Sequence, residues 1–343
     1  LGYSNTTSLF SSFRTVLIKN QKSQCAFVST NSISQGQHVP TFWPHLLNNG
    51  VMISFAHQSF KWGNNAKGNA GVTVVIIGLC DEKSPVIKRI YSEEHMRETS
   101  NISPYLTPNR NIFVNNRTSP LCSVPKMVFG NQAIDGGFLI LSDSEKKSLL
   151  SKSPSVKEFL RPLYGAEDFL HDKTRWCIWV KDKDLKRANK ITEIKSRFAS
   201  VKSYRKNGGQ VAKSLVETPY RFRYVHEADK HLLIIPRTTS ENRRYMPVGL
   251  KSSDVIVTDA IQVIYDSEMY MLGFLSSLMH IIWVKAIAGG LETRIRYSNT
   301  LCYNTFPFPT ISKSRKDEIT RGGFAILEER EKHPEKTLAE LYD

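Results

Sequence analysis

Two runs of β-branched residues constrain the fold of this chain more than any other feature. Residues 51–57 and 72–78 each have strand length and are rich in Val and Ile, a composition that favours strands over helices. A polar stretch, residues 59–70, joins them. The pair therefore predicts a long antiparallel hairpin.

The residues before this hairpin predict further elements of an α/β sheet. The apolar spacing of residues 6–22 predicts a helix, residues 24–30 a short buried strand, and residues 39–49 a second helix. A helix, a strand, a helix and a hairpin in this order are typical of the second half of an α/β enzyme sheet. The hairpin is expected at its antiparallel edge.

The polar stretch inside the hairpin carries two large aromatic residues, Phe60 and Trp62, beside Lys61 and Lys67. One interpretation is that an aromatic ring stacks on a nucleic-acid base while the lysines contact backbone phosphates. The other is that the rings fill the hairpin's own apolar core. The spacing of these residues leaves both interpretations open.

A strong positive charge points to a polyanionic partner. The 343 residues carry a formal charge of +15, which favours nucleic acid first and an anionic membrane surface second. Residues 181–250 hold 17 Lys or Arg and 7 Asp or Glu, a net +10, so the charge is concentrated. Residues 269–291 are apolar but are interrupted by Ser276, Ser277, His280 and Lys285. They predict a buried helix, and no membrane partner is expected.

The five cysteines lack any Cys-x-x-Cys pair, which argues against a zinc site and a disulfide framework, so no metal is expected. The first residues show no secretion signal, which predicts a cytoplasmic protein. The abrupt ends suggest a piece of a longer chain. Four ranges are predicted: sheet residues 1–85, a connecting region 86–125, an α+β domain 126–310 and a helical segment 311–343. Strands are predicted at residues 175–180, 232–236, 255–257 and 260–265, and two short helices in residues 313–343.

Several strings along the chain resemble a known family. Phe-Val-Ser-Thr-Asn-Ser-Ile-Ser-Gln-Gly at 27–36, Phe-Ala-His-Gln-Ser-Phe-Lys-Trp at 55–62 and the run at 71–78 resemble the second half of the catalytic domain of MmeI-type adenine-N6 DNA methyltransferases. The family's target-recognition domain is similar to later stretches, at residues 102–106, 125–132, 135–137, 161–167, 236–247, 297–299 and 306–309. The resemblance covers nearly the whole chain in the right order.

The resemblance implies the C-terminal half of a Rossmann-like methyltransferase sheet, followed by an α+β target-recognition domain and a short helical tail. It also implies methyl transfer from S-adenosylmethionine to N6 of an adenine flipped out of double-stranded DNA, within a restriction-modification enzyme. The family's glycine-rich cofactor loop and Asn-Pro-Pro-aromatic turn are not found, because the chain contains no Gly-x-Gly and no Asn-Pro-Pro. The chain is therefore expected to lack the N-terminal methylase half, to bind no cofactor and to be inactive alone.

The resemblance also suggests roles for individual residues. Phe60 is expected to stack on the flipped adenine, with Trp62 as second choice, whereas His57 is expected to be a strand-end side chain with its hydrogen bonds satisfied. The turn predicted to read bases contains Thr238, Ser240, Glu241, Arg243 and Arg244, in which Glu241 suits a cytosine amine and the arginines suit guanine. Alternatively, Glu241 merely pairs with a neighbouring arginine. Phosphate contacts are predicted for Lys61, Lys67, Lys186, Arg187, Lys202, Arg205 and Lys206.

Two other functions stay open. The chain can be a non-catalytic DNA-binding specificity subunit that works with a separate methylase chain. A basic RNA-binding protein is the other candidate, although no single-strand platform motif is found. An in-frame cofactor loop and Asn-Pro-Pro turn upstream of residue 1 would favour the methyltransferase.

Overall fold

The computed structural model describes residues 23–63, 72–92, 94–291 and 294–343. The helix predicted at 6–22 and the side chain of Lys67 lie outside these residues. Contacts divide the chain into two compact units, and each is described by itself. The first unit comprises Leu1–Cys122 and Ile282–Pro307, and the second comprises Ser123–Ile281 and Phe308–Asp343.

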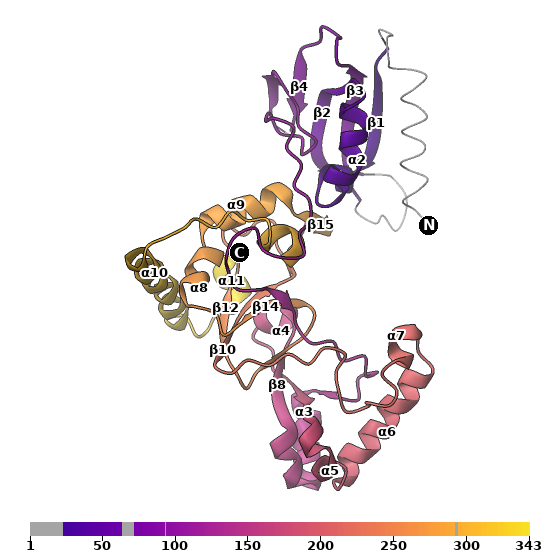
Figure 1. Ribbon diagram of the computed structural model, residues 1–343, viewed down its shortest axis with the longest axis vertical. Helices are drawn as coiled ribbons and strands as arrows, with labels where there is room; N and C mark the ends of the chain where they lie inside the picture. The colour runs from indigo at the N-terminus through magenta and orange to yellow at the C-terminus, as the bar shows by residue number, and fades with distance from the viewer. Residues whose placement is uncertain (1–22, 64–71, 93, 292–293) are drawn as a thin grey trace. The chain divides into compact units, whose positions relative to one another are not determined.

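A mixed β-sheet forms the centre of the first unit (Figure 1). Its strands are β1 (Cys25–Thr30), β2 (Val51–Lys61), β3 (Thr73–Asp81), β4 (Lys88–Tyr91) and β5 (Met96–Thr99). Among the described residues their order is β1-β3-β2-β4-β5, with β2 antiparallel to β3 and parallel to β4. The predicted hairpin is confirmed.

The expected edge position of this hairpin is wrong, because β1 pairs with β3 on one side and β4 pairs with β2 on the other. Strands β4 and β5 also lie inside the range 86–125 that was interpreted as a connecting region. Their sequences hide the strand pattern because charged residues pair across them, as Arg89 and Glu98 do at 3.1 Å.

Helix α2 (His38–Leu47) packs on one face of this sheet. Val39, Trp43 and Leu46 on the helix join Ile53 and Ile77 on the strands in one apolar core. The strand β1 is confirmed, but its side chains alternate between half-buried and exposed rather than being buried throughout. This alternation shows that β1 packs against the helix with only one of its faces.

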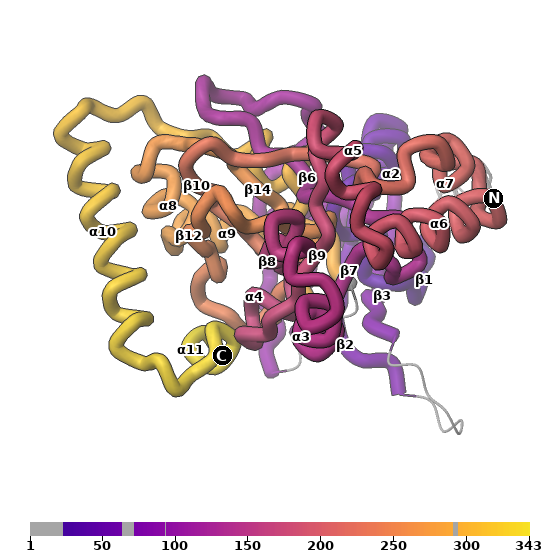
Figure 2. The backbone as a smooth tube through the Cα atoms, turned by 90° about the horizontal axis from the view of Figure 1, so that it is seen from below, coloured from indigo at the N-terminus to yellow at the C-terminus, as the bar shows by residue number. Residues whose placement is uncertain are grey.

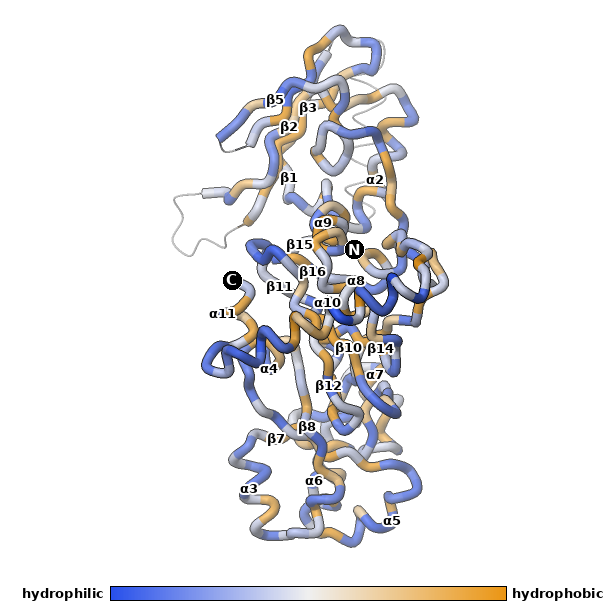
Figure 3. Tube along the Cα trace, turned by 90° about the vertical axis from the view of Figure 1, so that its left-hand side faces the viewer, coloured by the Kyte–Doolittle hydropathy of each residue, from blue (hydrophilic) through white to orange (hydrophobic). Residues whose placement is uncertain are grey.

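The apolar stretch 269–291 forms two helices instead of the predicted one, α8 (Tyr270–Leu275) and α9 (Leu278–Ile287), followed by strand β15 (Gly289–Leu291). Ser277 causes the break, because its hydroxyl accepts a hydrogen bond from the His280 backbone N–H and so caps the start of α9. Figure 3 shows α9 coloured mostly hydrophobic. In the described ranges, no helix combines the length and hydropathy needed to cross a membrane.

The C-terminal part of the first unit continues with β16 (Arg294–Arg296) and a π-helical turn, Asn299–Tyr303. Backbone hydrogen bonds tie it to an earlier segment of the same unit, from Arg117 N to Thr300 O at 2.9 Å and from Leu121 N to Asn304 O at 2.7 Å. Residues predicted to belong to the range 126–310 therefore fall partly in the first unit.

Two small sheets form the second unit. One contains β12 (Gly249–Ser252), β10 (His231–Pro236), β14 (Ile261–Tyr265) and β6 (Val128–Phe129), in this order. The other contains β13 (Ile256–Val257), β8 (Leu160–Tyr164), β9 (Arg175–Ile178) and β7 (Ile140–Leu141). The strands predicted at 175–180, 232–236, 255–257 and 260–265 are confirmed.

The helices of the second unit surround these sheets. They are α3 (Asp143–Lys152), α4 (Ala166–Leu170), α5 (Leu185–Ala188), α6 (Thr192–Lys206), α7 (Gln210–Lys213), α8, α10 (Lys313–Glu331) and α11 (Leu338–Tyr342), with short 3-10 turns at Pro154–Phe159 and Asp182–Asp184. Figure 2 shows the long α10 followed by α11 at the C-terminus, as predicted for residues 313–343. Helix α6 buries Ile194, Phe198 and Val201 against the sheet of β8 and β9.

Candidate nucleic-acid interface

The two aromatic residues singled out in the hairpin lie at the end of β2, outside the apolar core under α2. Phe60 is opposite Val74 on β3, just after an irregularity in the pairing between His57 and Phe60. The Trp62 backbone N–H donates to Val72 O at 2.8 Å, which continues the hairpin past β2. The Phe60 side chain is half-buried and Trp62 is 43% exposed. Neither ring fills the hairpin's core.

A row of rings supports this end of the sheet. The His57 imidazole meets the Phe60 ring edge to face, with 4.7 Å between centroids, and it stacks on Tyr91 of β4 at 6.5 Å. Phe60 and Trp62 are 6.4 Å apart. The His57 Nδ1 lies 3.0 Å from Gln58 O, in line with the expectation for His57. These contacts hold Phe60 in place from beneath while Trp62 stays accessible.

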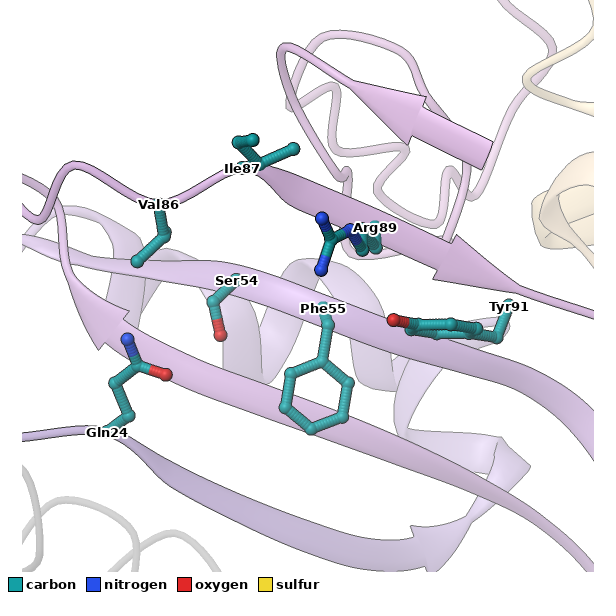
Figure 4. A pocket seen from close by; sticks show the side chains of 7 residues that line it. All are labelled: Gln24, Ser54, Phe55, Val86, Ile87, Arg89 and Tyr91. Atoms are coloured by element: carbon teal, nitrogen blue, oxygen red, sulfur yellow. The ribbon is translucent and has the colours of Figure 1, made fainter. Parts of the chain in front are cut away.

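Tyr91 was not among the predicted residues, since β4 is too short for its alternation to stand out in the sequence. It also borders a pocket of about 590 Å³ on the sheet face opposite α2. Figure 4 shows Phe55, Arg89 and Tyr91 projecting from this face, with Gln24, Ser54, Val86 and Ile87 around them. The Arg89 side chain pairs with Glu98.

The lining of the pocket beside Tyr91 does not fit a bound S-adenosylmethionine. The donor's sulfonium and amino groups are cationic and its ribose offers two hydroxyls, so a cofactor pocket needs a carboxylate and a glycine-rich loop. The lining of the pocket beside Tyr91 contains an arginine and no carboxylate. The sequence holds no Gly-x-Gly string.

The second unit presents most of the predicted phosphate contacts on its surface. Lys186 on α5 and Lys206 at the end of α6 are exposed. Arg187 is also exposed but pairs with Glu158 at 3.1 Å and with Asp184 at 2.8 Å, and Lys202 pairs with Glu217 at 2.9 Å. Exposed pairs of this kind are weak and exchange readily for other anions. In the first unit, Lys61 at the end of β2 is exposed.

The prediction that Arg205 contacts phosphate is wrong. Its side chain is 0% exposed, and its five N–H groups donate to backbone carbonyls. The acceptors are Ile134 O (2.8 Å), Leu215 O (2.9 Å), Thr218 O (2.8 Å), Ala133 O (2.9 Å) and Arg221 O (2.7 Å). Burial lowers the pKa of this guanidinium below its usual value. Arg205 ties three loops together and has no donor left for DNA.

The turn predicted to read bases begins with the short strand β11 (Thr238–Thr239). Arg243 is 4% exposed; its guanidinium pairs with Asp343 at 2.8 Å and donates to the Thr239 hydroxyl at 2.9 Å. Arg244 is exposed and lies 5.6 Å over the Tyr245 ring. Glu241 and Ser240 are half-buried in the same turn. Arg243 thus anchors the turn from below while Arg244 projects from it.

Asn131 and Asp135 act structurally. Asn131 is 1% exposed; its side chain donates to His226 O at 3.0 Å and accepts from His226 N at 2.7 Å. The Asp135 carboxylate accepts from Leu139 N at 2.6 Å. Both side chains hold loops in place.

A mixed sheet bearing a row of rings, together with a unit rich in surface lysines and arginines, is typical of proteins that bind nucleic acid. Comparison with known families agrees with this class. Residues 7–92 match the model of the MmeI DNA-methyltransferase domain, and residues 108–310 match the model of the MmeI target recognition domain. The chain belongs to the MmeI family.

Two known proteins are particularly similar to this chain. One is DNA methyltransferase A of Bacillus subtilis (strain 168), 42% identical over 319 residues, a match that spans 93% of this chain and 36% of the relative. The other is the type IIL restriction-modification enzyme MmeI, solved in complex with DNA, which superposes with a TM-score of 0.92 at 35% identity over 98% of this chain and 46% of that one. The chain thus spans less than half the length of either protein.

Proposed function

We propose that this chain supplies the base-stacking and target-reading parts of an adenine-N6 DNA methyltransferase that belongs to a restriction-modification enzyme. The substrate is double-stranded DNA, and the methyl donor is S-adenosylmethionine bound by the full-length enzyme. Membership in the MmeI family and the DNA held by the solved relative support this proposal. Such an enzyme acts on DNA in the cytoplasm of a bacterial or archaeal cell.

The observation that carries the proposal is the placement of Phe60 and Trp62. Both rings sit at the end of β2, one half-buried against His57 and the other exposed. An extruded base loses a few kcal/mol of stacking, and a protein ring can restore part of it. Phe60 is the first choice for this role because the His57 contact fixes its orientation, and Trp62 is the second.

Phosphate contacts come from the exposed basic residues. Lys61 lies next to Phe60, so it contacts the backbone beside the flipped base. Lys186, Arg187, Lys202 and Lys206 form the basic surface of the second unit, while Lys67 is assigned by sequence only. Such contacts position the protein without reading sequence.

The turn at residues 238–244 reads bases. Glu241 accepts from a cytosine amine and Arg244 donates to guanine, while Thr238 and Ser240 provide hydroxyls at the same edge. A direct role for Arg243 requires its pair with Asp343 to open on DNA binding. Otherwise Arg243 determines the shape of the turn that presents Glu241.

The chain by itself is not sufficient for methylation, because it contains neither a Gly-x-Gly loop nor an Asn-Pro-Pro turn. The alternative of a non-catalytic specificity subunit has less support. Residues matching a methyltransferase domain precede the recognition domain in the same chain, an arrangement that a separate specificity subunit does not need.

The proposal is tested by Phe60→Ala in the full-length enzyme. Loss of the ring should slow methylation by about tenfold or more, since about 1–3 kcal/mol of stacking is removed. Binding to DNA with an abasic or mismatched target should weaken far less. Trp62→Ala serves as the matched variant and should have the smaller effect. Equal methylation rates for Phe60→Ala and the wild type would refute the role of Phe60.

A further inference from the structure

A polar network connects three loops of the second unit next to the predicted recognition turn. The Gln132 side chain donates from Nε2 to Asp259 Oδ2 at 3.1 Å and accepts at Oε1 from Arg223 Nη1, also at 3.1 Å. The backbone follows the same path, since Arg223 N donates to Gln132 O at 2.7 Å and Asp259 N donates to Asn131 O at 3.1 Å. No function was predicted for Gln132, Arg223 or Asp259.

The network is continuous with the turn at residues 238–244. Arg237, which directly precedes Thr238, donates from Nη1 to Asp259 O at 2.9 Å and from its backbone N–H to Ala260 O at 3.0 Å. The chain of contacts therefore runs from the predicted recognition turn through Arg237 and Asp259 to Gln132 and Arg223.

Stacked rings stiffen both arginines of this network. The Arg223 guanidinium lies 4.9 Å over the Tyr224 ring, and the Arg237 guanidinium lies 4.7 Å over the Phe129 ring. Tyr224 and Phe129 are 38% and 37% exposed. A guanidinium stacked on an aromatic face keeps its planar donor edge directed outward, so it loses little entropy when it binds a planar acceptor.

The backbone beneath the network is closely packed. A Cβ placed on Gly130 would stand 2.2 Å from Thr258 O, so the loop that carries Gln132 lies directly on the turn that carries Asp259. Gln132 and Asp259 are half-buried and Arg223 is exposed. The Gln132 amide bonds both the Arg223 guanidinium and the Asp259 carboxylate and holds them apart. In the major groove, an arginine donates to guanine and a carboxylate accepts from cytosine, so this pair has the pattern needed to distinguish the two bases.

We infer that Arg223 and Asp259, joined by Gln132, form a second base-reading cluster of this protein. Arg223 donates to the O6 and N7 acceptors of a guanine, Asp259 accepts from a cytosine amine, and Gln132 is the positioning residue that holds both. This inference rests on the proposed function, because it needs a duplex bound across the second unit.

The experiment uses the full-length enzyme on a DNA library with a randomised target site. Arg223→Ala should reduce discrimination at one base pair by about tenfold or more, because a bidentate arginine contact to guanine is lost. Asp259→Asn should change the preference at a cytosine. Gln132→Glu still accepts from Arg223 but cannot donate to Asp259, so it should keep the guanine preference and lose the cytosine preference.

Lys206→Ala is the matched control, and it should weaken binding to all sequences alike. Unchanged site preference in Arg223→Ala, or a uniform loss of affinity as in the control, would overturn the inference while leaving the proposed function in place. A wild-type enzyme that binds and methylates no DNA in the library would instead refute the proposed function. Thermal unfolding of each variant measures whether the substitution leaves the fold intact.

Discussion

The Phe55 ring lies directly over Gly78 on the neighbouring strand, so that a Cβ on Gly78 would stand 2.2 Å from the ring atoms Cδ1 and Cε1. Phe55 and Gly78 are paired across β2 and β3. The aromatic ring covers the backbone that glycine leaves bare, an arrangement that stabilises sheet glycines. The same ring lines the pocket that Tyr91 borders.

Gly78→Ala should destabilise the sheet by about 1–3 kcal/mol, because the added methyl group forces the Phe55 ring off its position. Urea denaturation of the variant measures the free energy of unfolding. In the double variant with Phe55→Ala the clash disappears, so the two effects should not add. Additive losses would show that the ring does not rest on Gly78.

Arg205→Lys should cost about 3 kcal/mol or more of stability although it keeps the positive charge. Lysine reaches too few of the five carbonyls that the guanidinium bonds, which leaves buried acceptors unsatisfied. Denaturant unfolding measures this loss, with Lys206→Ala on the same helix as the control. Unchanged stability together with weaker DNA binding would restore the phosphate role of Arg205.

His280 should make the protein less stable in acid. Burial lowers the pKa of the His280 imidazole to about 3, while an unfolded histidine titrates near its ordinary value of 6.5. Below about pH 6.5 the unfolded state therefore binds more protons, so stability falls as the pH decreases towards about 3, by up to about 1.4 kcal/mol per unit from this group. Above pH 6.5 the contribution is complete.

His280→Gln measures this contribution. The variant removes the titrating group, so the free energy of unfolding should vary less steeply between pH 6 and pH 4 than in the wild type. The slope is the readout, since a changed core also alters absolute stability. Identical slopes in the two proteins would show that His280 is not neutral and buried in solution.

Exchanging Glu241 and Arg243 should change the base pair that the full-length enzyme prefers, because a glutamate and an arginine select opposite partners in the major groove. Methylation of a randomised DNA library measures the preference. An exchanged variant that is stable yet keeps the original preference would exclude this turn from base readout.

Lys202→Ala should weaken binding to all sequences alike and reduce the slope of log K against log salt concentration by about one unit.

The Glu241 and Arg243 exchange also needs a stability control. Arg243 pairs with Asp343 and with Thr239, so its replacement should loosen the turn and the C-terminal helix α11. Asp343→Asn weakens the same pair without touching the turn. If that variant also alters site preference, Arg243 acts by shaping the turn rather than by direct contact.

Local patterns in the sequence were sufficient to predict the strands β1, β2, β3, β9, β10 and β14, the helix α2 and the tail helices, because periodicity and cap residues act over a few positions. The residue spacing on α6 also indicates that Arg205 is buried. Ile194, Phe198, Val201 and Arg205 follow one helical stripe, so the arginine continues the apolar face. Its neighbour Lys206 lies off this stripe and is exposed.

The sequence by itself determined the family, the hairpin with its two aromatic residues and the concentration of positive charge. Only the tertiary structure decided which of the basic residues are available to a partner. Arg205 donates hydrogen bonds to carbonyls up to 72 residues away in the sequence, and Arg243 pairs with a carboxylate 100 residues further along the chain. Contacts at such separations depend on how the sheets and loops pack, and no local pattern of residues contains that information.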